Sequence, residues 1–199
     1  GTFRYLKNVM GLWLAQQSRA TWRAQGSEYS YDDLTHLAEA AEPFRSLIDP
    51  DASEFLPPGD MPERVREFCR ATDQPVPETV GQVMRTIYES LALKYRWALE
   101  RMMATSGKRV DVMHVIGGGS RSALLCQMTA NAIGRPVVAG PAEATALGNA
   151  VVQLITLGKL ESLAAARQVV AQSTETKRFE PQQQQDWDAA NTRFSHLIR

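Results

Sequence analysis

The sequence has few cysteines and no excess of charge of either sign. Cys69 and Cys126 are the two cysteines among 199 residues, and neither belongs to a C-x-x-C pair. This spacing argues against a disulfide scaffold or a zinc site and favours the reducing cytoplasm as the location. Lysine and arginine together number 22, as do aspartate and glutamate, so no net field attracts the chain to nucleic acid or to an anionic membrane. We therefore expect a small ligand that is recognised locally.

Long apolar runs and clusters of metal ligands are also lacking. No run approaches the roughly 20 apolar residues that cross a bilayer, and no basic stretch followed by an apolar one resembles a signal peptide. The histidines at 36, 114 and 196 have no metal-ligand spacing, and His114 falls in an apolar strand, where we expect a hydrogen-bonded core histidine. We predict no metal site formed by side chains. The chain opens with Gly1 and not with methionine, so we expect it to be cut from a longer protein.

What the sequence does have is a glycine triplet between two regular elements. Residues 110–116 are rich in β-branched side chains, Gly117, Gly118 and Gly119 follow, and an amphipathic segment begins at Ser120. This order predicts a strand, a tight loop and a helix. Glycine permits close approach of a ligand to the main chain, and the start of a helix exposes free N–H groups that suit a phosphate or a polar heterocycle. A plain tight turn also explains the triplet, but we favour ligand contact.

The residues after the triplet fail the common nucleotide and hydrolase motifs. Ser122 stands where the dinucleotide fingerprint G-x-G-x-x-G needs its third glycine. Gly119, Ser120 and Arg121 replace the Gly-Lys-Ser/Thr of a P-loop. No G-x-S-x-G nucleophile elbow surrounds the serines. A nicotinamide oxidoreductase, a P-loop enzyme and an acyl transferase are therefore unsupported.

The rest of the chain is predicted to be mainly helical. Residues 136–139 predict a second strand, parallel to the first through a right-handed crossover. Residues 44–62 are expected to form an irregular loop. Small residues in the helix that follows the second strand predict close backbone packing against a neighbour. Helices are expected, from apolar spacing and capping residues, over residues 5–25, 30–42, 60–74, 80–107, 120–134, 140–158 and 163–170, and after Pro181.

The first predicted helix has a side that fits the wall of a cleft. Small residues at positions 11 and 15 leave room there, and the amides of Asn8 and Gln16 offer both hydrogen-bond donors and acceptors. A solvated helix side explains the same pattern equally well.

Three segments carry a resemblance to a known family. Residues 6–14 (LKNVMGLWL), 115–121 (VIGGGSR) and 138–149 (VAGPAEATALGN) together resemble the carboxy-terminal half of FGGY carbohydrate kinases, and within them the branch that acts on rhamnulose. The resemblance runs from Phe3 to the final helix. It implies a helix-rich α/β fold: the carboxy-terminal, ribonuclease H-like domain of a sugar kinase of the actin/hexokinase type, here with a short remnant of parallel sheet.

The resemblance also implies an activity and a set of binding residues. The implied reaction is phosphoryl transfer from ATP, with Mg²⁺, to the 1-hydroxyl of L-rhamnulose in rhamnose catabolism. Asn8 is expected to lie toward the sugar. Ser122 replaces an asparagine that is common in the family, which removes an amide contact to the base. The residues expected at the nucleotide are Gly118 first, then Gln16, Gly117, Gly119 and Ser120.

The family's catalytic aspartate and phosphate-gripping loops precede the point where this sequence starts. We therefore expect residues 1–199 to form a single nucleotide-binding domain without the sugar-binding domain and without its own first strands. Such a chain is expected to be inactive alone and to expose an edge of strand 110–116 through which copies can associate. Two alternatives stay open at this stage: another kinase of the family, acting on fuculose, xylulose or glycerol, and a non-catalytic helical interaction domain.

Overall fold

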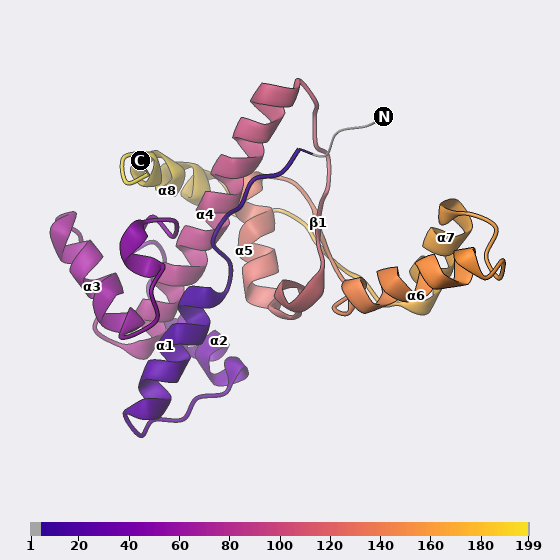
Figure 1. The fold of residues 1–199 in the computed structure, drawn as a ribbon. Helices are drawn as coiled ribbons and strands as arrows, with labels where there is room; N and C mark the ends of the chain where they lie inside the picture. Colours follow the sequence, from indigo (N-terminus) through magenta and orange to yellow (C-terminus); the bar gives the residue numbers. More distant parts are fainter. Residues whose placement is uncertain (1–4, 199) are drawn as a thin grey trace.

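The computed structural model describes residues 5–198, so Gly1 and Phe3 lie outside the described residues. A body of helices stands on one side of a small sheet, and a pair of helices projects from the other side (Figure 1). This arrangement confirms the prediction of a helix-rich α/β fold. In chain order the elements are α1 (Trp13–Ala24), α2 (Tyr31–Ala40), the 3₁₀ turn η1 (Ser53–Phe55), α3 (Met61–Ala71), α4 (Val80–Ser106), β1 (Met113–Val115), the 3₁₀ turn η2 (Gly117–Arg121), α5 (Ala123–Ile133), β2 (Val137–Ala139), α6 (Ala144–Thr156), α7 (Leu163–Ser173), β3 (Lys177–Phe179) and α8 (Gln184–Ser195).

Helix ends lie where capping residues predict them. Ser30 and Asp33 form a capping box at the start of α2, and the Asp60 side chain accepts a hydrogen bond from the Glu63 N–H at the start of α3. Gly107 and Gly134, both left-handed, end α4 and α5. These local signals need no tertiary partner, and the predictions based on them are confirmed.

The prediction that the first helix begins at Tyr5 is wrong. Residues 5–11 are not helical, and α1 begins at Trp13. The physical reason lies far along the chain, since the Met10 N–H donates to Asp51 Oδ1 at 2.8 Å. A second tie joins Trp13 Nε1 to the Phe55 carbonyl at 3.2 Å. Leu6, expected on an apolar helix face, is 72% exposed.

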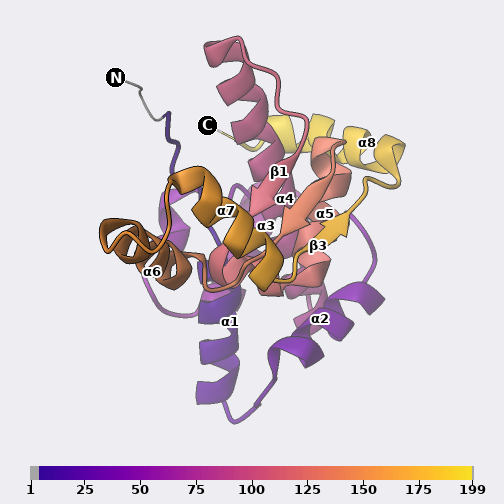
Figure 2. The same cartoon turned by 90° about the vertical axis from the view of Figure 1, so that its right-hand side faces the viewer.

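The sheet has three short strands in the order β1-β2-β3. β1 and β2 are parallel as predicted, with His114 opposite Val138. The third strand, β3, is antiparallel to β2 and was not predicted, so the sheet is mixed and not purely parallel. The strands lie side by side in Figure 2, with α5 behind the sheet and α6 and α7 in front. Within residues 5–198, β1 pairs with β2 alone, which leaves its other edge open as expected.

The main core surrounds α4. Its middle is buried on nearly every side, because α2, α3, α5 and α8 all pack around it. Leu91, Leu93 and Phe194 are among its fully buried side chains. A smaller cluster joins Cys126 and Ala130 of α5 to Val137 and Phe179 of the sheet. The core therefore fixes α5, and with it the loop that precedes α5, on a rigid helical base.

The helices α6 and α7 form an arm in which few side chains are buried. No residue of α6 is buried, and a side chain added at Gly148 would meet no atom within 4 Å. Among the described residues, α6 packs mainly against α7 and lies away from the body (Figure 1), so the predicted close packing of this small-residue helix is wrong. None of the helices described for residues 5–198 is both long and apolar enough to span a bilayer.

Glu89 in α4 gives the stability a specific pH dependence. Burial raises its pKa to about 7, although Arg85 Nε lies 2.7 Å from Oε1. The folded chain therefore binds this proton more tightly than the unfolded chain, so the contribution of Glu89 is fully present below pH 4.5 and is lost as the pH rises through about 7. We expect the difference in free energy of unfolding, wild type minus Glu89→Gln, to decrease as the pH rises from 4.5 to about 7. Urea denaturation of both proteins across this pH range measures the difference, and a difference that does not change with pH would contradict the prediction.

Candidate functional site

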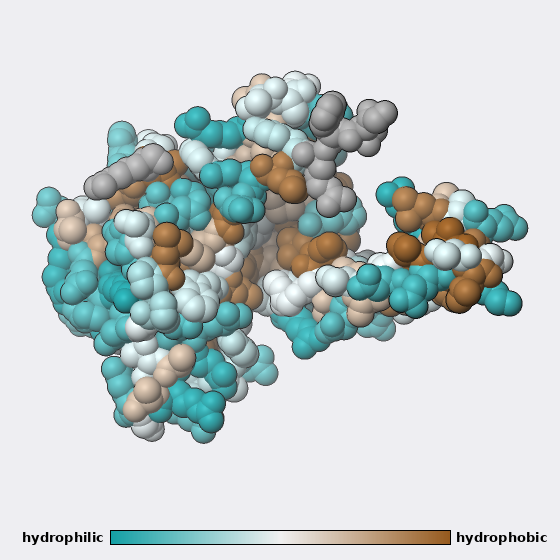
Figure 3. Space-filling model, viewed as in Figure 1, coloured by the Kyte–Doolittle hydropathy of each residue, from teal (hydrophilic) through white to brown (hydrophobic). Residues whose placement is uncertain are grey.

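A large hollow of the described structure is lined by residues of the glycine triplet. Its volume is about 1080 Å³, and the space-filling view shows the surface recessed between the helical body and the strand side (Figure 3). Its walls come from the segment before α1, from α1, α2 and α4, and from β1, η2 and α5. Residues far apart in the sequence therefore share one cavity.

The triplet itself folds into the 3₁₀ turn η2, and the helix predicted from Ser120 begins at Ala123 with Ser122 as its N-cap. Gly117 adopts a φ of +74°, which favours glycine, and its N–H donates to the Pro141 carbonyl at 3.1 Å. The Ser120 hydroxyl donates to the Gly117 carbonyl at 2.7 Å. Gly117 and Ser120 therefore shape the turn and are not among the lining residues.

Gly118 and Gly119 are the two glycines of the triplet that line the cavity. A Cβ placed on Gly118 would meet no heavy atom within 4 Å, and one on Gly119 would lie 3.7 Å from Val115 Cγ1. The space beside Gly118 is thus open toward the cavity. A ligand can approach the main chain there as closely as the sequence predicts.

Gln16 lies on the opposite wall of the same cavity. It is exposed near the start of α1 and lines the cavity together with Leu12. Asn8 lies outside the helix, in the segment before α1, so the two amides do not share a helix face. Lys7 and Val9 line the cavity, but Asn8 between them is not among the lining residues.

Several other lining residues were not predicted from the sequence. Tyr88 and Tyr95, two turns apart on α4, form part of one wall, and Tyr31 of α2 adds a third ring. His114, expected to be a core histidine, is exposed and lines the cavity because β1 is an edge strand. The seven-residue spacing of the two α4 tyrosines could have suggested a shared face.

Two side chains of the wall, those of Tyr95 and Cys126, are held in their protonated forms. Burial raises the pKa of Tyr95 to about 12 and that of the Cys126 thiol to about 11. Neither group can act as a nucleophile or a general base near neutral pH. The wall is therefore suited to binding and not to bond-making by these residues.

The charged side chains at the cavity are those of Lys7, Asp32 and Arg121. Among residues 5–198, no group of three His, Cys, Asp or Glu side chains could hold a metal ion. The arrangement can hold an anionic ligand with an apolar part, since the open main chain at Gly118 shares the cavity with the tyrosine rings and the Gln16 amide.

Comparison with known proteins places the chain in a family. Its residues 1–157 match the family described as "FGGY family of carbohydrate kinases, C-terminal domain". The chain is 49% identical over 199 residues to the rhamnulokinase of Bacteroides thetaiotaomicron, covering 100% of this chain and 40% of that protein. It is 40% identical over 182 residues to the rhamnulokinase of Lactiplantibacillus plantarum, covering 92% and 37%.

Solved structures agree on the fold. A xylulose kinase from Rhodospirillum rubrum matches with a TM-score of 0.62 and 22% identity, over 93% of this chain and 36% of that one. A gluconate kinase from Lactobacillus acidophilus matches with a TM-score of 0.62 and 14% identity, over 94% and 37%. The chain thus spans about 40% of the length of the relatives it matches. By the match over residues 1–157, it belongs to the FGGY family of carbohydrate kinases, in the region of their C-terminal domain.

Proposed function

We propose that this chain is the nucleotide-binding part of an ATP-dependent sugar kinase that phosphorylates the 1-hydroxyl of L-rhamnulose in cytoplasmic rhamnose catabolism. The observation that carries the nucleotide part is the meeting of Gly118, Gly119 and Gln16 in one open cavity. The sugar is inferred from relatives named rhamnulokinase, which are up to 49% identical, whereas the xylulose kinase from Rhodospirillum rubrum is 22% identical.

The size and the chemistry of the cavity support an adenine nucleotide as its ligand. Its volume is in the range that holds a small-molecule cofactor. The open main chain at Gly118 allows close approach, and the tyrosine rings and the Gln16 amide of the walls suit a purine. ATP, when bound, supplies the transferred phosphoryl group. Among residues 5–198 no group of three His, Cys, Asp or Glu side chains could hold a metal, so we infer that Mg²⁺ would be held mainly by the phosphates of the nucleotide.

The proposed division of labour assigns binding to this chain and proton transfer to residues outside it. Phosphoryl transfer to an alcohol needs a group that accepts the hydroxyl proton. Tyr95 and Cys126 keep their own protons near neutral pH, so the cavity wall does not supply that base through them. Asn8, in the extended segment at the rim, is proposed to face the sugar.

Gly118→Val tests the nucleotide proposal. The valine side chain would enter the open space beside the turn, so we expect ADP to bind at least about tenfold more weakly in calorimetric titration. Gly148→Val is the matched control, since its side chain also meets no atom within 4 Å but lies on the arm. Equal ADP affinity of both variants and wild type would overturn the assignment of the cavity.

A chimera tests the kinase proposal. This chain would replace the matching 40% of the Bacteroides thetaiotaomicron rhamnulokinase. We expect the chimera to consume ATP with L-rhamnulose, to lose that activity with Gly118→Val, and to be inactive when the chain is assayed alone. Turnover by the chain alone would refute the division of labour.

A further inference from the structure

Arg121 is a charged group at the cavity to which the proposal above gives no role. It ends the turn η2, next to the glycine triplet, and lines the cavity. Its Nη2 lies 2.6 Å from Oε1 of Glu143, the residue that precedes α6. Among the described residues, the carboxylate that pairs with the guanidinium is that of Glu143.

Another anion can readily replace Glu143 as the partner of Arg121. The side chains of Arg121 and Glu143 are 69% and 71% exposed, and exposed pairs contribute little to stability. By contrast, Lys94 is buried between Asp49 and Asp51 and is not free to meet a ligand. Arg121 can therefore leave Glu143 for a stronger anion without disturbing the fold.

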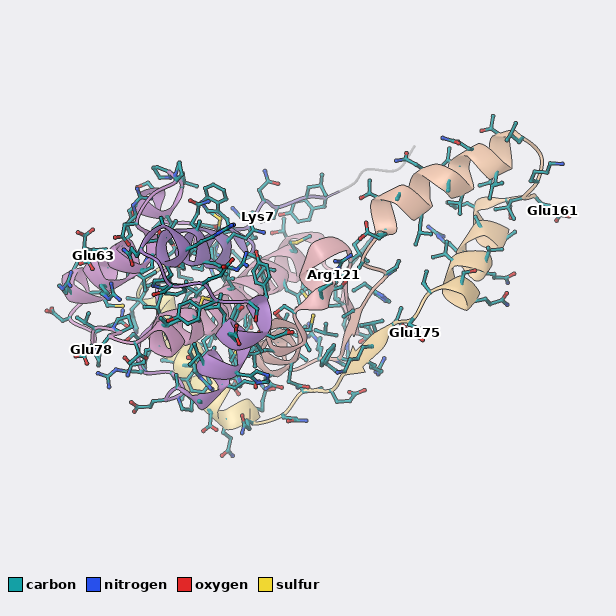
Figure 4. The ribbon with its side chains drawn as sticks, turned by 90° about the horizontal axis from the view of Figure 1, so that it is seen from below. Lys7, Glu63, Glu78, Arg121, Glu161 and Glu175 are labelled. Carbon is teal, nitrogen blue, oxygen red and sulfur yellow. The ribbon has the colours of Figure 1, made fainter. Side chains whose placement is uncertain are left out.

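Lys7 offers a second positive charge from the facing wall. It lies in the segment before α1, is exposed, and forms no ion pair with any other residue in the range 5–198. Its Nζ stands 5.7 Å from the centroid of the Trp97 ring. The view from below shows both Lys7 and Arg121 near the middle of the molecule (Figure 4). The described lining thus has two cations and Asp32 as its carboxylate.

Resting on the nucleotide proposal, we propose that Arg121 binds the phosphate chain of the nucleotide and that Glu143 is the carboxylate the phosphates displace. Arginine suits this role because its planar fork donates two parallel hydrogen bonds to one phosphate. Arg121 stands three residues after Gly118 in the same turn, and both line the cavity. Lys7 adds charge from the other wall.

The test is calorimetric titration of the 199-residue chain with ADP, adenosine and inorganic tripolyphosphate. Arg121→Gln is expected to weaken ADP and tripolyphosphate by about tenfold and to leave adenosine unchanged. Arg121→Lys should recover part of the loss. Glu143→Gln should tighten ADP by about twofold, because no carboxylate then competes. Arg178→Gln is the matched control: Arg178 forms the same 2.6 Å pair with Glu180, at similar exposure, and does not line the cavity.

The outcomes separate the two proposals. If wild type binds ADP and Arg121→Gln binds it equally well, the role of Arg121 is overturned and the nucleotide proposal stands. If wild type binds no nucleotide but binds tripolyphosphate through Arg121, the nucleotide proposal falls and the anion site stands. If wild type binds neither, both fall. Equal losses in Arg121→Gln and Arg178→Gln would also overturn the role, because a general charge effect would then explain both.

Discussion

Asp49→Ala is expected to lower the free energy of unfolding by about 3 kcal/mol. Lys94, in the middle of α4, is 2% exposed, and its Nζ lies 2.7 Å from Asp49 Oδ1 and 3.3 Å from Asp51 Oδ2. Removing the nearer carboxylate leaves a buried ammonium with only the longer Asp51 contact and the face of the Trp97 ring, 4.6 Å away, and removing one partner of a buried ion pair is strongly destabilising. Urea denaturation measures the loss.

The matched control for Asp49→Ala is Glu100→Ala. Glu100 also pairs with a cation of α4, since Arg96 Nε lies 2.8 Å from its Oε1, but its side chain is 50% exposed. We expect that variant to lose less than about 1 kcal/mol. If the two variants lose equal stability, burial does not decide the strength of the Lys94 pair.

The Lys94 cluster also explains why the start of α1 could not be predicted from the sequence. The apolar spacing of residues 5–25 fits a helix by itself, and no local signal opposes it. Asp51, which contacts Lys94, accepts a hydrogen bond from the Met10 N–H, 41 residues away in the sequence. This bond keeps residues 5–11 out of a helix. Helix ends set by Ser30, Asp60 and Gly107 were predictable because their partners lie within a few residues.

The strand pairs also show that structure decided by distant residues could not be predicted from local sequence patterns. The parallel pair of β1 and β2 follows from two β-branched runs around one helix. The third strand has only the residues Lys177, Arg178 and Phe179, two of them charged, and its pairing with β2 is decided by the arrival of the chain from the arm. Three residues carry no alternation that could separate a strand from a loop.

Part of the candidate site was predictable from local sequence motifs. The triplet and Gln16 were found from the sequence, and the structure places Gly118, Gly119 and Gln16 at one cavity. The tyrosines of α2 and α4 were not found, because their meeting depends on how those helices cross. His114 was assigned to the core because its strand is apolar, but the exposure of a residue on β1 depends on which strands cover that edge.

Gly81→Ala is expected to destabilise the fold by about 3 kcal/mol, through the crossing of α2 and α4. A Cβ on Gly81 would lie 2.3 Å from the Leu37 carbonyl oxygen and 2.9 Å from its carbon. Both are backbone atoms, so no side-chain rotation relieves the contact and α2 must move away from α4. Alanine is the better helix former by about 1 kcal/mol, so the contact decides the sign.

Gly148→Ala isolates that contact from helix propensity. It makes the same change in a helix where the added methyl meets no atom within 4 Å, so we expect no loss of stability on thermal unfolding. Because α2 supplies Tyr31, Asp32 and Thr35 to the cavity, Gly81→Ala should also weaken ADP binding, whereas Gly148→Ala should not. A Gly81→Ala chain as stable as wild type would show that α2 can shift freely, and α2 would then not be a fixed wall of the nucleotide cavity.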